Sequence, residues 1–136
     1  MYWDKIEHDK FEVSIKALIY DDQQRLLLEK DVKGKWDLPG GRISAQETIE
    51  QCLRREVQEE LGVSISTIEA SPKYAELISF IDDKKRFSIG FKIVPASFNF
   101  VTDNVENTET GFFTAEEFDN LDQAYQGLKL IKNKLF

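Results

Sequence analysis

The stretch GGRISAQETIEQCLRREVQEELGV, residues 40–63, joins a glycine pair to a strongly amphipathic segment. Ser44 and Glu47 fit a capping box, in which the hydroxyl accepts first-turn N–H groups and the carboxylate reaches back to the cap. Gly62 fits a left-handed helix end, where a residue with a Cβ atom would be strained. The stretch therefore predicts a helix over residues 45–61, entered through the glycine pair.

This helix places carboxylates on an apolar surface. At about 100° per residue, its apolar stripe consists of Ile49, Leu53, Val57 and Leu61. Glu56 and Glu60 fall inside the stripe, and Glu59 lies beside it. Carboxylates that face a core are costly unless they are paired, protonated or bound to a metal. A divalent cation is the simplest neutraliser of three crowded carboxylates, and their oxygens suit Mg²⁺ or Mn²⁺.

The composition indicates one globular domain. The 136 residues are 41% hydrophobic and 12% aromatic, which is enough for a real core. The net charge of −7 argues against a nucleic acid polymer as partner, because such binding depends on neutralising phosphates. A small phosphorylated ligand remains compatible with this charge, since a bound metal reverses the local sign.

The cellular setting is predicted from what the sequence lacks. No stretch approaches the ~20 apolar residues of a membrane span, and the first ten residues, MYWDKIEHDK, lack the apolar run of a signal peptide. Cys52 is the single cysteine, so the chain forms no disulfide within itself. These features predict a soluble cytoplasmic protein with no membrane partner.

Alternating apolar residues and turn signals predict the remaining elements. Strands are expected at residues 11–20, 25–29, 63–68, 74–81, 86–94 and 111–113, the first two and the fourth and fifth forming hairpins. The acidic segment 102–109 is expected to be a loop. Thr114 and Glu117 form a second capping box, which predicts a helix to Leu121, and a last helix runs to about Leu135. The order predicts a mixed α/β domain whose helices cover a curved sheet.

Written with its spacings, the opening stretch resembles the Nudix box, GX5EX7REUXEEXGU with U aliphatic, at every fixed position from Gly41 to Val63. The segments 36–40, WDLPG, and 111–118, GFFTAEEF, are also similar to the family. The resemblance implies one Nudix domain over residues 1–136. It implies an α/β/α sandwich, with the box helix on one face of a mixed curved sheet and the C-terminal helices on the other.

The resemblance also assigns roles by position. The implied metal ligands are the carboxylates of Glu56, Glu59 and Glu60 and the backbone carbonyl of Gly40. Glu47 and Arg55 are implied to brace the loop and the helix around the site. On a continuous helix these two residues lie about 80° apart, so they meet only if the helix start bends toward Arg55.

The implied reaction is hydrolysis of a nucleoside diphosphate linked to a further group X, with Mg²⁺ or Mn²⁺ as cofactor. Metals neutralise the diphosphate and acidify a bound water, and a carboxylate takes its proton. Glu56 is one candidate base. A glutamate late in the chain is the alternative base, with Glu109 preferred over Glu106. For both residues, an ordinary loop position without a catalytic role is equally compatible with the sequence.

Two further residues are candidate substrate contacts. Arg42 follows the glycine pair and is placed to hold a terminal phosphate, or else it is a plain surface cation. Trp36 is a candidate for stacking on a base, although a packing role is the stronger expectation.

The expected substrate is a (deoxy)nucleoside triphosphate, including oxidised forms. Nucleotide sugars and ADP-ribose are alternatives, and Ser79 stands where ADP-ribose hydrolases carry a proline. A domain that senses nucleotides without turnover is another alternative, but a pure binder does not need three crowded carboxylates. The expected partner is a small nucleotide bound by a monomer or homodimer.

Overall fold

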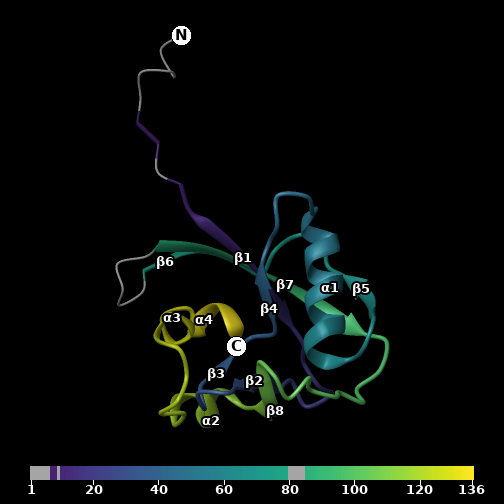
Figure 1. Cartoon of the computed structure of the whole chain (residues 1–136). Coiled ribbons are helices and arrows are strands. Elements are labelled where there is room, and N and C mark those ends of the chain that lie inside the picture. The colour runs from purple at the N-terminus through teal and green to yellow at the C-terminus, as the bar shows by residue number, and fades with distance from the viewer. Residues whose placement is uncertain (1–6, 9, 80–84) are drawn as a thin grey trace.

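The structure is a computed structural model that describes residues 7–8, 10–79 and 85–136. Figure 1 shows its elements in chain order. They are β1 (Glu12–Leu18), β2 (Leu26–Asp31), β3 (Trp36–Asp37), β4 (Gly40–Arg42), α1 (Ile49–Leu61), β5 (Ile65–Ile68), β6 (Tyr74–Ser79), β7 (Lys85–Pro95), β8 (Asn107–Phe113), α2 (Ala115–Asp119), α3 (Gln126–Leu130) and α4 (Lys132–Leu135).

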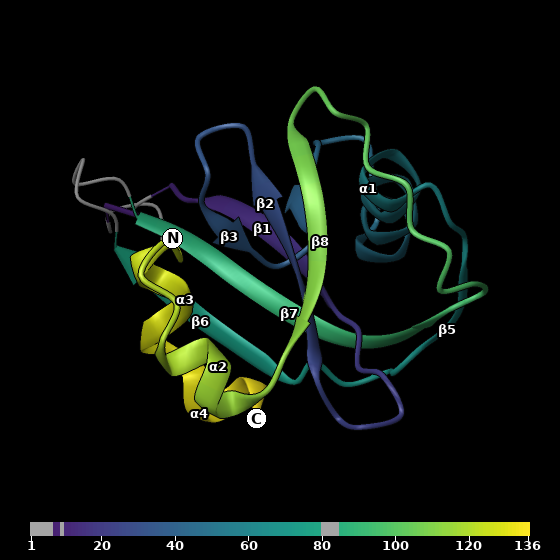
Figure 2. The ribbon, with the colours of Figure 1, turned by 90° about the horizontal axis from the view of Figure 1, so that it is seen from below.

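The strands divide between two sheets. The first has the order β4-β1-β7-β5, with β6 also paired to β7. Strand β1 runs parallel to β7, while β4 is antiparallel to β1 and both β5 and β6 are antiparallel to β7. The second sheet is antiparallel, with the order β3-β2-β8. Figure 2 shows β2 and β8 crossing in front of the long β7.

Helices cover the first sheet on both faces. Successive side chains of β1 point to opposite faces, so this strand contributes to an apolar core on each side. Ile15 and Ala17 join the core under α1, which includes Leu53 and Val57. Leu18 points the other way and joins the core under the C-terminal helices. The predicted α/β class, with the box helix and the C-terminal helices on opposite faces, is therefore confirmed.

Helix α1 begins later than predicted. Its N-cap is Thr48, which forms the capping box with Gln51, so the first helical residue is Ile49. Ser44 is not the cap; its N–H donates to Glu47 at 3.0 Å within the preceding loop. The predicted end is confirmed, since Gly62 caps the helix in the left-handed region with φ 69°.

Other elements differ in extent. The predicted hairpin of residues 11–20 and 25–29 is reduced to one bridge between Tyr20 and Leu26, because β1 pairs instead with β4 and β7. The hairpin of β6 and β7 is confirmed, although part of its turn falls outside the described residues. The expected loop 102–109 ends early, since β8 begins at Asn107.

The C-terminal region confirms one prediction and modifies another. Thr114 and Glu117 form the predicted capping box at the start of α2. The single last helix that was expected is two short helices, α3 and α4, separated at Ile131. Leu128 of α3 and Leu135 of α4 pack into the core that Leu18 shares with Phe118.

Candidate functional site

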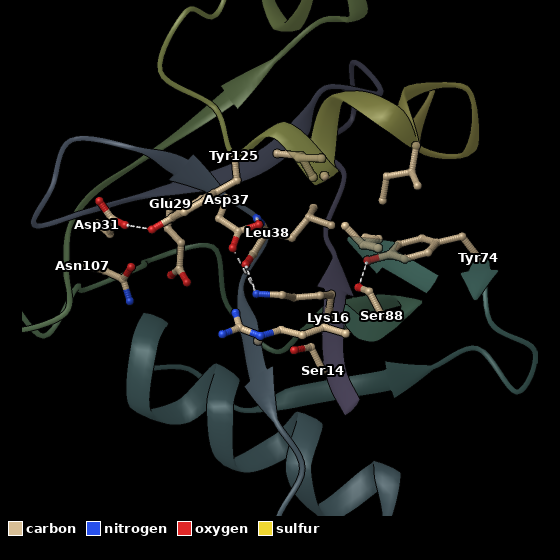
Figure 3. A pocket seen from close by; sticks show the side chains of 16 residues that line it. Ser14, Lys16, Glu29, Asp31, Asp37, Leu38, Tyr74, Ser88, Asn107 and Tyr125 are labelled. Atoms are coloured by element: carbon tan, nitrogen blue, oxygen red, sulfur yellow. Dashed lines mark hydrogen bonds and ion pairs between the residues drawn. The ribbon is translucent and has the colours of Figure 1, made fainter. Parts of the chain in front are cut away.

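A cavity of about 230 Å³ lies where the two sheets and α3 meet. Figure 3 shows the side chains that line it. Its polar walls come from both sheets and its apolar wall from α3 and neighbouring residues. The lining residues are Ser14, Lys16, Glu29, Asp31, Asp37, Leu38, Gly40, Tyr74, Ile78, Arg86, Ser88, Asn107, Tyr125, Gly127, Leu128 and Ile131.

Gly40 joins this cavity to the box helix. It lines the cavity, and its backbone N–H donates a 2.9 Å hydrogen bond to Oε2 of Glu60. Its φ of +131° and its place against β1 both require glycine, because a Cβ atom would lie 2.1 Å from the carbonyl oxygen of Ile15. Gly40 therefore connects the cavity wall to the Glu60 carboxylate of α1.

A second buried glutamate meets Glu60 from the neighbouring sheet. Glu29, in β2, is only 4% exposed, and its carboxyl hydrogen-bonds that of Glu60, which is 6% exposed. Burial is the largest cause that raises the pKa of both groups, and the interaction with the Glu60 carboxyl raises the pKa of Glu29 further. Sequence reasoning did not identify Glu29; the available signal was an acid directly after three leucines in a predicted strand.

Arg55 connects the remaining carboxylates of the box. Its Nε and Nη2 donate to Glu47 at 2.6 and 2.9 Å. Its Nη1 donates to Glu56 at 2.9 Å and to Glu59 at 3.2 Å. The hydrogen bonds from Arg55 lower the pKa of Glu47 to about 2. These two residues meet because α1 begins at Ile49, which leaves Glu47 in the preceding loop.

Gly41 leaves room for the side chain of Glu56. A Cβ atom on Gly41 would lie 2.5 Å from Oε1 of Glu56, so only a residue without a side chain permits this position. The Glu56 side chain is 13% exposed, whereas that of Glu59 is 58% exposed. The structure thus presents one shielded and one open carboxylate beside buried Glu60.

Two of the described cations line the cavity, Lys16 and Arg86, and Lys16 is the one bonded to Asp37. Its Nζ donates to Asp37 at 3.3 Å and to the carbonyl oxygen of Leu38 at 3.2 Å. Burial lowers the pKa of Lys16, but Asp37 and Glu60 outweigh this effect and hold the pKa above its ordinary value. A charged ammonium group therefore faces the buried carboxyls.

Of the site residues singled out by the sequence, all of which the structure describes, Gly40 alone lines the cavity, and four others make their contacts elsewhere. Arg42 is exposed and pairs with Glu12 at 3.0 Å. Trp36 packs edge-on against Phe113, with ring centroids 4.9 Å apart. Glu109 lies in β8 and pairs with Lys30 at 3.2 Å, and Glu106 is exposed. The structure does not bring these four residues to the buried carboxyls.

The donor set of the site suits a hard divalent cation. It consists of carboxylates on one helix and the backbone of the glycine pair, and oxygen ligands of this kind bind Mg²⁺ or Mn²⁺. Within the residues that the structure describes, no three acidic, histidine or cysteine side chains already converge as a metal cage. Arg55 helps to explain why these carboxylates do not converge, because its guanidinium binds Glu56 and Glu59.

Comparison with solved structures places the fold. A MutT protein from Methanosarcina mazei superposes with a TM-score of 0.80 at 20% identity and covers 96% of both chains. In the described part of the chain, no helix has the length and apolar character needed to cross a membrane.

Comparison with curated proteins identifies sequence relatives. An RNA pyrophosphohydrolase from Ruthia magnifica subsp. Calyptogena magnifica is 31% identical over 124 residues, which covers 85% of this chain and 68% of that protein. An 8-oxo-dGTP diphosphatase from Proteus vulgaris is 44% identical over 39 residues, covering 29% of this chain and 35% of that protein. Other curated relatives are matched over only 19–39% of their own length.

The family follows from the match to its profile. The NUDIX domain profile covers residues 10–133, which include both sheets, the box helix and almost all of the C-terminal helices. Enzymes of this family generally use divalent metal ions, in keeping with the donor set around Gly40. This chain belongs to the Nudix family.

Proposed function

We propose that this chain is a metal-dependent pyrophosphohydrolase that acts on nucleoside triphosphates. The observation that carries the proposal is the hydrogen bond from Gly40 to Glu60, because it joins the box helix, through the Glu60 carboxylate, to the wall of a cavity of nucleobase size. The phosphates of a substrate then lie over the glycine pair, and the base enters the cavity.

The residues that hold the metal are Glu56, Glu59 and Glu60, with the carbonyl of Gly40 as a backbone ligand. A bound Mg²⁺ or Mn²⁺ neutralises the phosphates and makes a coordinated water more acidic. Glu56 and Glu59 are bonded to Arg55 in this structure, and both carboxylates would have to be released from it to hold a metal. Arg55 stays in place through its two bonds to Glu47, so the loop and the helix keep their positions.

Glu56 is the carboxylate that we place nearest to the attacking water, since it is shielded and lies against Gly41. A general base must come within hydrogen-bond reach of the water it deprotonates. Glu109 remains the alternative base. To take that role it must leave its ion pair with Lys30 when substrate binds.

A nucleoside triphosphate is favoured as substrate by relatives named 8-oxo-dGTP diphosphatase. The Ruthia relative is named RNA pyrophosphohydrolase and matches most of this chain, so a triphosphorylated RNA end is the second candidate. The net charge of −7 favours the free nucleotide, because a polymer brings many phosphates to an acidic surface. Nucleotide sugars, ADP-ribose and pure nucleotide sensing remain alternatives, and the cytoplasmic location and the monomer or homodimer stay predictions.

The proposal is tested with a substrate panel assayed with Mg²⁺ and with Mn²⁺. The panel contains ribo- and deoxynucleoside triphosphates, a triphosphorylated RNA, ADP-ribose and a nucleotide sugar, and ³¹P NMR identifies the products. We expect nucleoside monophosphate and pyrophosphate from a triphosphate. Faster turnover of the RNA supports the second candidate, and binding without turnover of any member supports the sensing domain.

A further inference from the structure

The described part of the first sheet has three edge strands, β4, β5 and β6, and two of them are protected. An unpaired edge presents a row of N–H and C=O groups to any further strand, so native proteins shorten, bulge or cover it. Strand β4 has only three residues, and the N–H of its Gly40 is bonded to Glu60. Strand β5 has an irregular register, and Arg54 donates to the carbonyl oxygen of Ile65 at 2.9 Å. Both strands are therefore poor templates for further pairing.

Strand β6 lacks this protection. Its six residues, Tyr74–Ser79, pair with β7 in an unbroken register, and in the described part of the chain β7 is the only strand that pairs with it. Its sequence, YAELIS, contains neither proline nor lysine and has one charged residue, Glu76. Since native proteins rarely leave such an edge open, the edge of β6 indicates that a further strand covers it.

A row of apolar side chains ends at this edge. The register places Val13 of β1 beside Phe87 of β7, and Phe87 beside Leu77 of β6, so the three side chains lie on one face of the sheet. Val13 packs against the core under α1, so this is the face that α1 covers. Figure 1 shows that β6 and the first half of β7 extend beyond α1. Leu77, at the end of the row, is accordingly 47% exposed.

A second copy of this chain supplies a strand that fits the edge. Antiparallel pairing of β6 with β6 of another copy is two-fold symmetric, and this is the commonest symmetry of homo-oligomers. Directly opposed residues of antiparallel strands point to the same face, so one residue of β6 must oppose itself across the two-fold axis. The choice of that residue decides whether the two copies are complementary.

Leu77 is the residue whose self-pairing fits best. A pairing centred on Glu76 would place two like charges directly opposite each other, which is destabilising. A pairing centred on Ala75 would draw Pro72 into the ladder, where it has no N–H to donate. A pairing centred on Leu77 opposes residues 75–79 of the two copies, and a centre nearer either end of β6 shortens this overlap. It also joins the two apolar rows into one continuous row across the axis.

We propose that this chain forms a two-fold symmetric homodimer in which the β6 strands of the two copies pair antiparallel, with Leu77 of one copy opposite Leu77 of the other. The pairing satisfies the outward N–H and C=O groups of β6 and removes Leu77 from water. Because Tyr74 and Ile78 of the same strand line the cavity, it also holds this wall of the cavity in place. The inference does not depend on the proposed function, since it concerns an edge of the sheet and not the reaction.

Sedimentation equilibrium from about 1 to 100 µM protein tests the assembly directly. We expect the wild type to be dimeric at the upper end of this range. Leu77→Lys removes the central leucine and opposes two like charges, so it should raise the Kd of the dimer by at least about 10²-fold. Val105→Lys is the matched control, because Val105 is 74% exposed in the loop before β8, and it should leave the Kd unchanged.

Two outcomes of sedimentation overturn the inference. One is a wild type that stays monomeric at the highest concentration, which would leave the edge of β6 to a different partner. The other is a dimer that Leu77→Lys leaves intact, or that Val105→Lys weakens as much. Circular dichroism of Leu77→Lys checks that its fold is retained, as the exposure of Leu77 implies.

Cysteine cross-linking tests the register of the pairing. In Leu77→Cys the two new Cβ atoms are directly opposed, at about 4.5–5.5 Å, so a small adjustment permits a disulfide. Ala75→Cys is the control, since Ala75 is exposed on the same face but opposes residue 79 of the other copy. Cys52 is buried and common to both variants. We expect a covalent dimer from Leu77→Cys alone after oxidation with diamide. Cross-linking of Ala75→Cys, or its absence in Leu77→Cys, contradicts the pairing.

Discussion

Arg55, in helix α1, holds the carboxylate of Glu47 through two hydrogen bonds of 2.6 and 2.9 Å. Planar guanidinium and carboxylate groups match in this two-point geometry, which fixes orientation as well as distance. The same guanidinium also bonds Glu56 and Glu59. One arginine therefore ties the loop before α1 to the carboxylates that we assign to the metal.

The pair predicts a pH-dependent loss of stability in Glu47→Gln. The folded pKa of Glu47 is about 2, below its ordinary value of 4.5, so its ionised form stabilises the fold. This contribution is complete above pH 4.5 and is lost as the pH falls toward 2. The Tm of Glu47→Gln should lie a few degrees below that of the wild type at pH 7, and the gap should close by pH 2. A gap that stays constant over this range contradicts the assigned role.

The two adjacent glycines should respond differently to alanine. In Gly41→Ala the new Cβ meets only the flexible end of Glu56, so the free energy of unfolding should change by less than about 1 kcal/mol. Displacing that carboxylate should lower Mg²⁺-dependent kcat/KM by about 10²-fold.

Gly40→Ala is the matched comparison. Its Cβ would meet the backbone of β1 and its φ is +131°, so we expect a loss of about 2–4 kcal/mol in stability. Chemical denaturation and steady-state assays on both variants check the contrast. Equal destabilisation by the two substitutions would contradict the contacts described here, in which Gly40 lies against the backbone of β1 and Gly41 against the end of Glu56.

Glu29→Gln should stabilise the metal-free protein at neutral pH. Because the folded pKa of Glu29 is raised, the native state keeps a proton that the unfolded chain releases, so this group costs stability as the pH rises above about 4.5. The Tm difference between variant and wild type, measured in EDTA, should grow in favour of the variant from pH 5 to pH 8. A difference that shrinks with rising pH would mean that Glu29 is ionised in the native state.

The apolar stripe of α1 is shorter than the periodicity predicts. Leu53 is fully buried, whereas Ile49 is 41% exposed at the first turn. Leu53→Ala should therefore cost about 2–5 kcal/mol, while Ile49→Ala should cost less than about 1 kcal/mol. Urea denaturation measures both, and similar costs would contradict the position of the helix start.

Features that depend on residues within one helical turn could be predicted from the sequence. The left-handed end at Gly62 and the capping box at Thr114 are both confirmed. The start of α1 is the instructive error, because Ser44 and Thr48 each head a capping motif. Local spacing does not show that Glu47 is bound by Arg55, and that contact leaves Thr48 as the cap.

Features that depend on packing between distant segments could not be predicted. Glu29 becomes part of the site only because β2 turns this side chain toward Glu60. Asn107 joins the cavity because β8 pairs with β2, in a segment that the composition indicates is a loop. The same pairing puts Glu109 opposite Lys30, a register that no local pattern indicates. The Nudix box therefore predicts the reaction class, whereas the pairing of β2 with β8 determines which of their residues line the cavity.

The most direct test of the central claim compares the wild type with a Glu59→Gln, Glu60→Gln double variant. Each is assayed for release of pyrophosphate from GTP over a Mg²⁺ titration, and Glu50→Gln, an exposed glutamate on the same helix, serves as the control. We predict saturable Mg²⁺ dependence in the wild type and the control, and a loss of at least about 10³-fold in kcat/KM in the double variant, with the fold retained. Undiminished pyrophosphate release by a folded double variant would contradict a metal centre built on these glutamates.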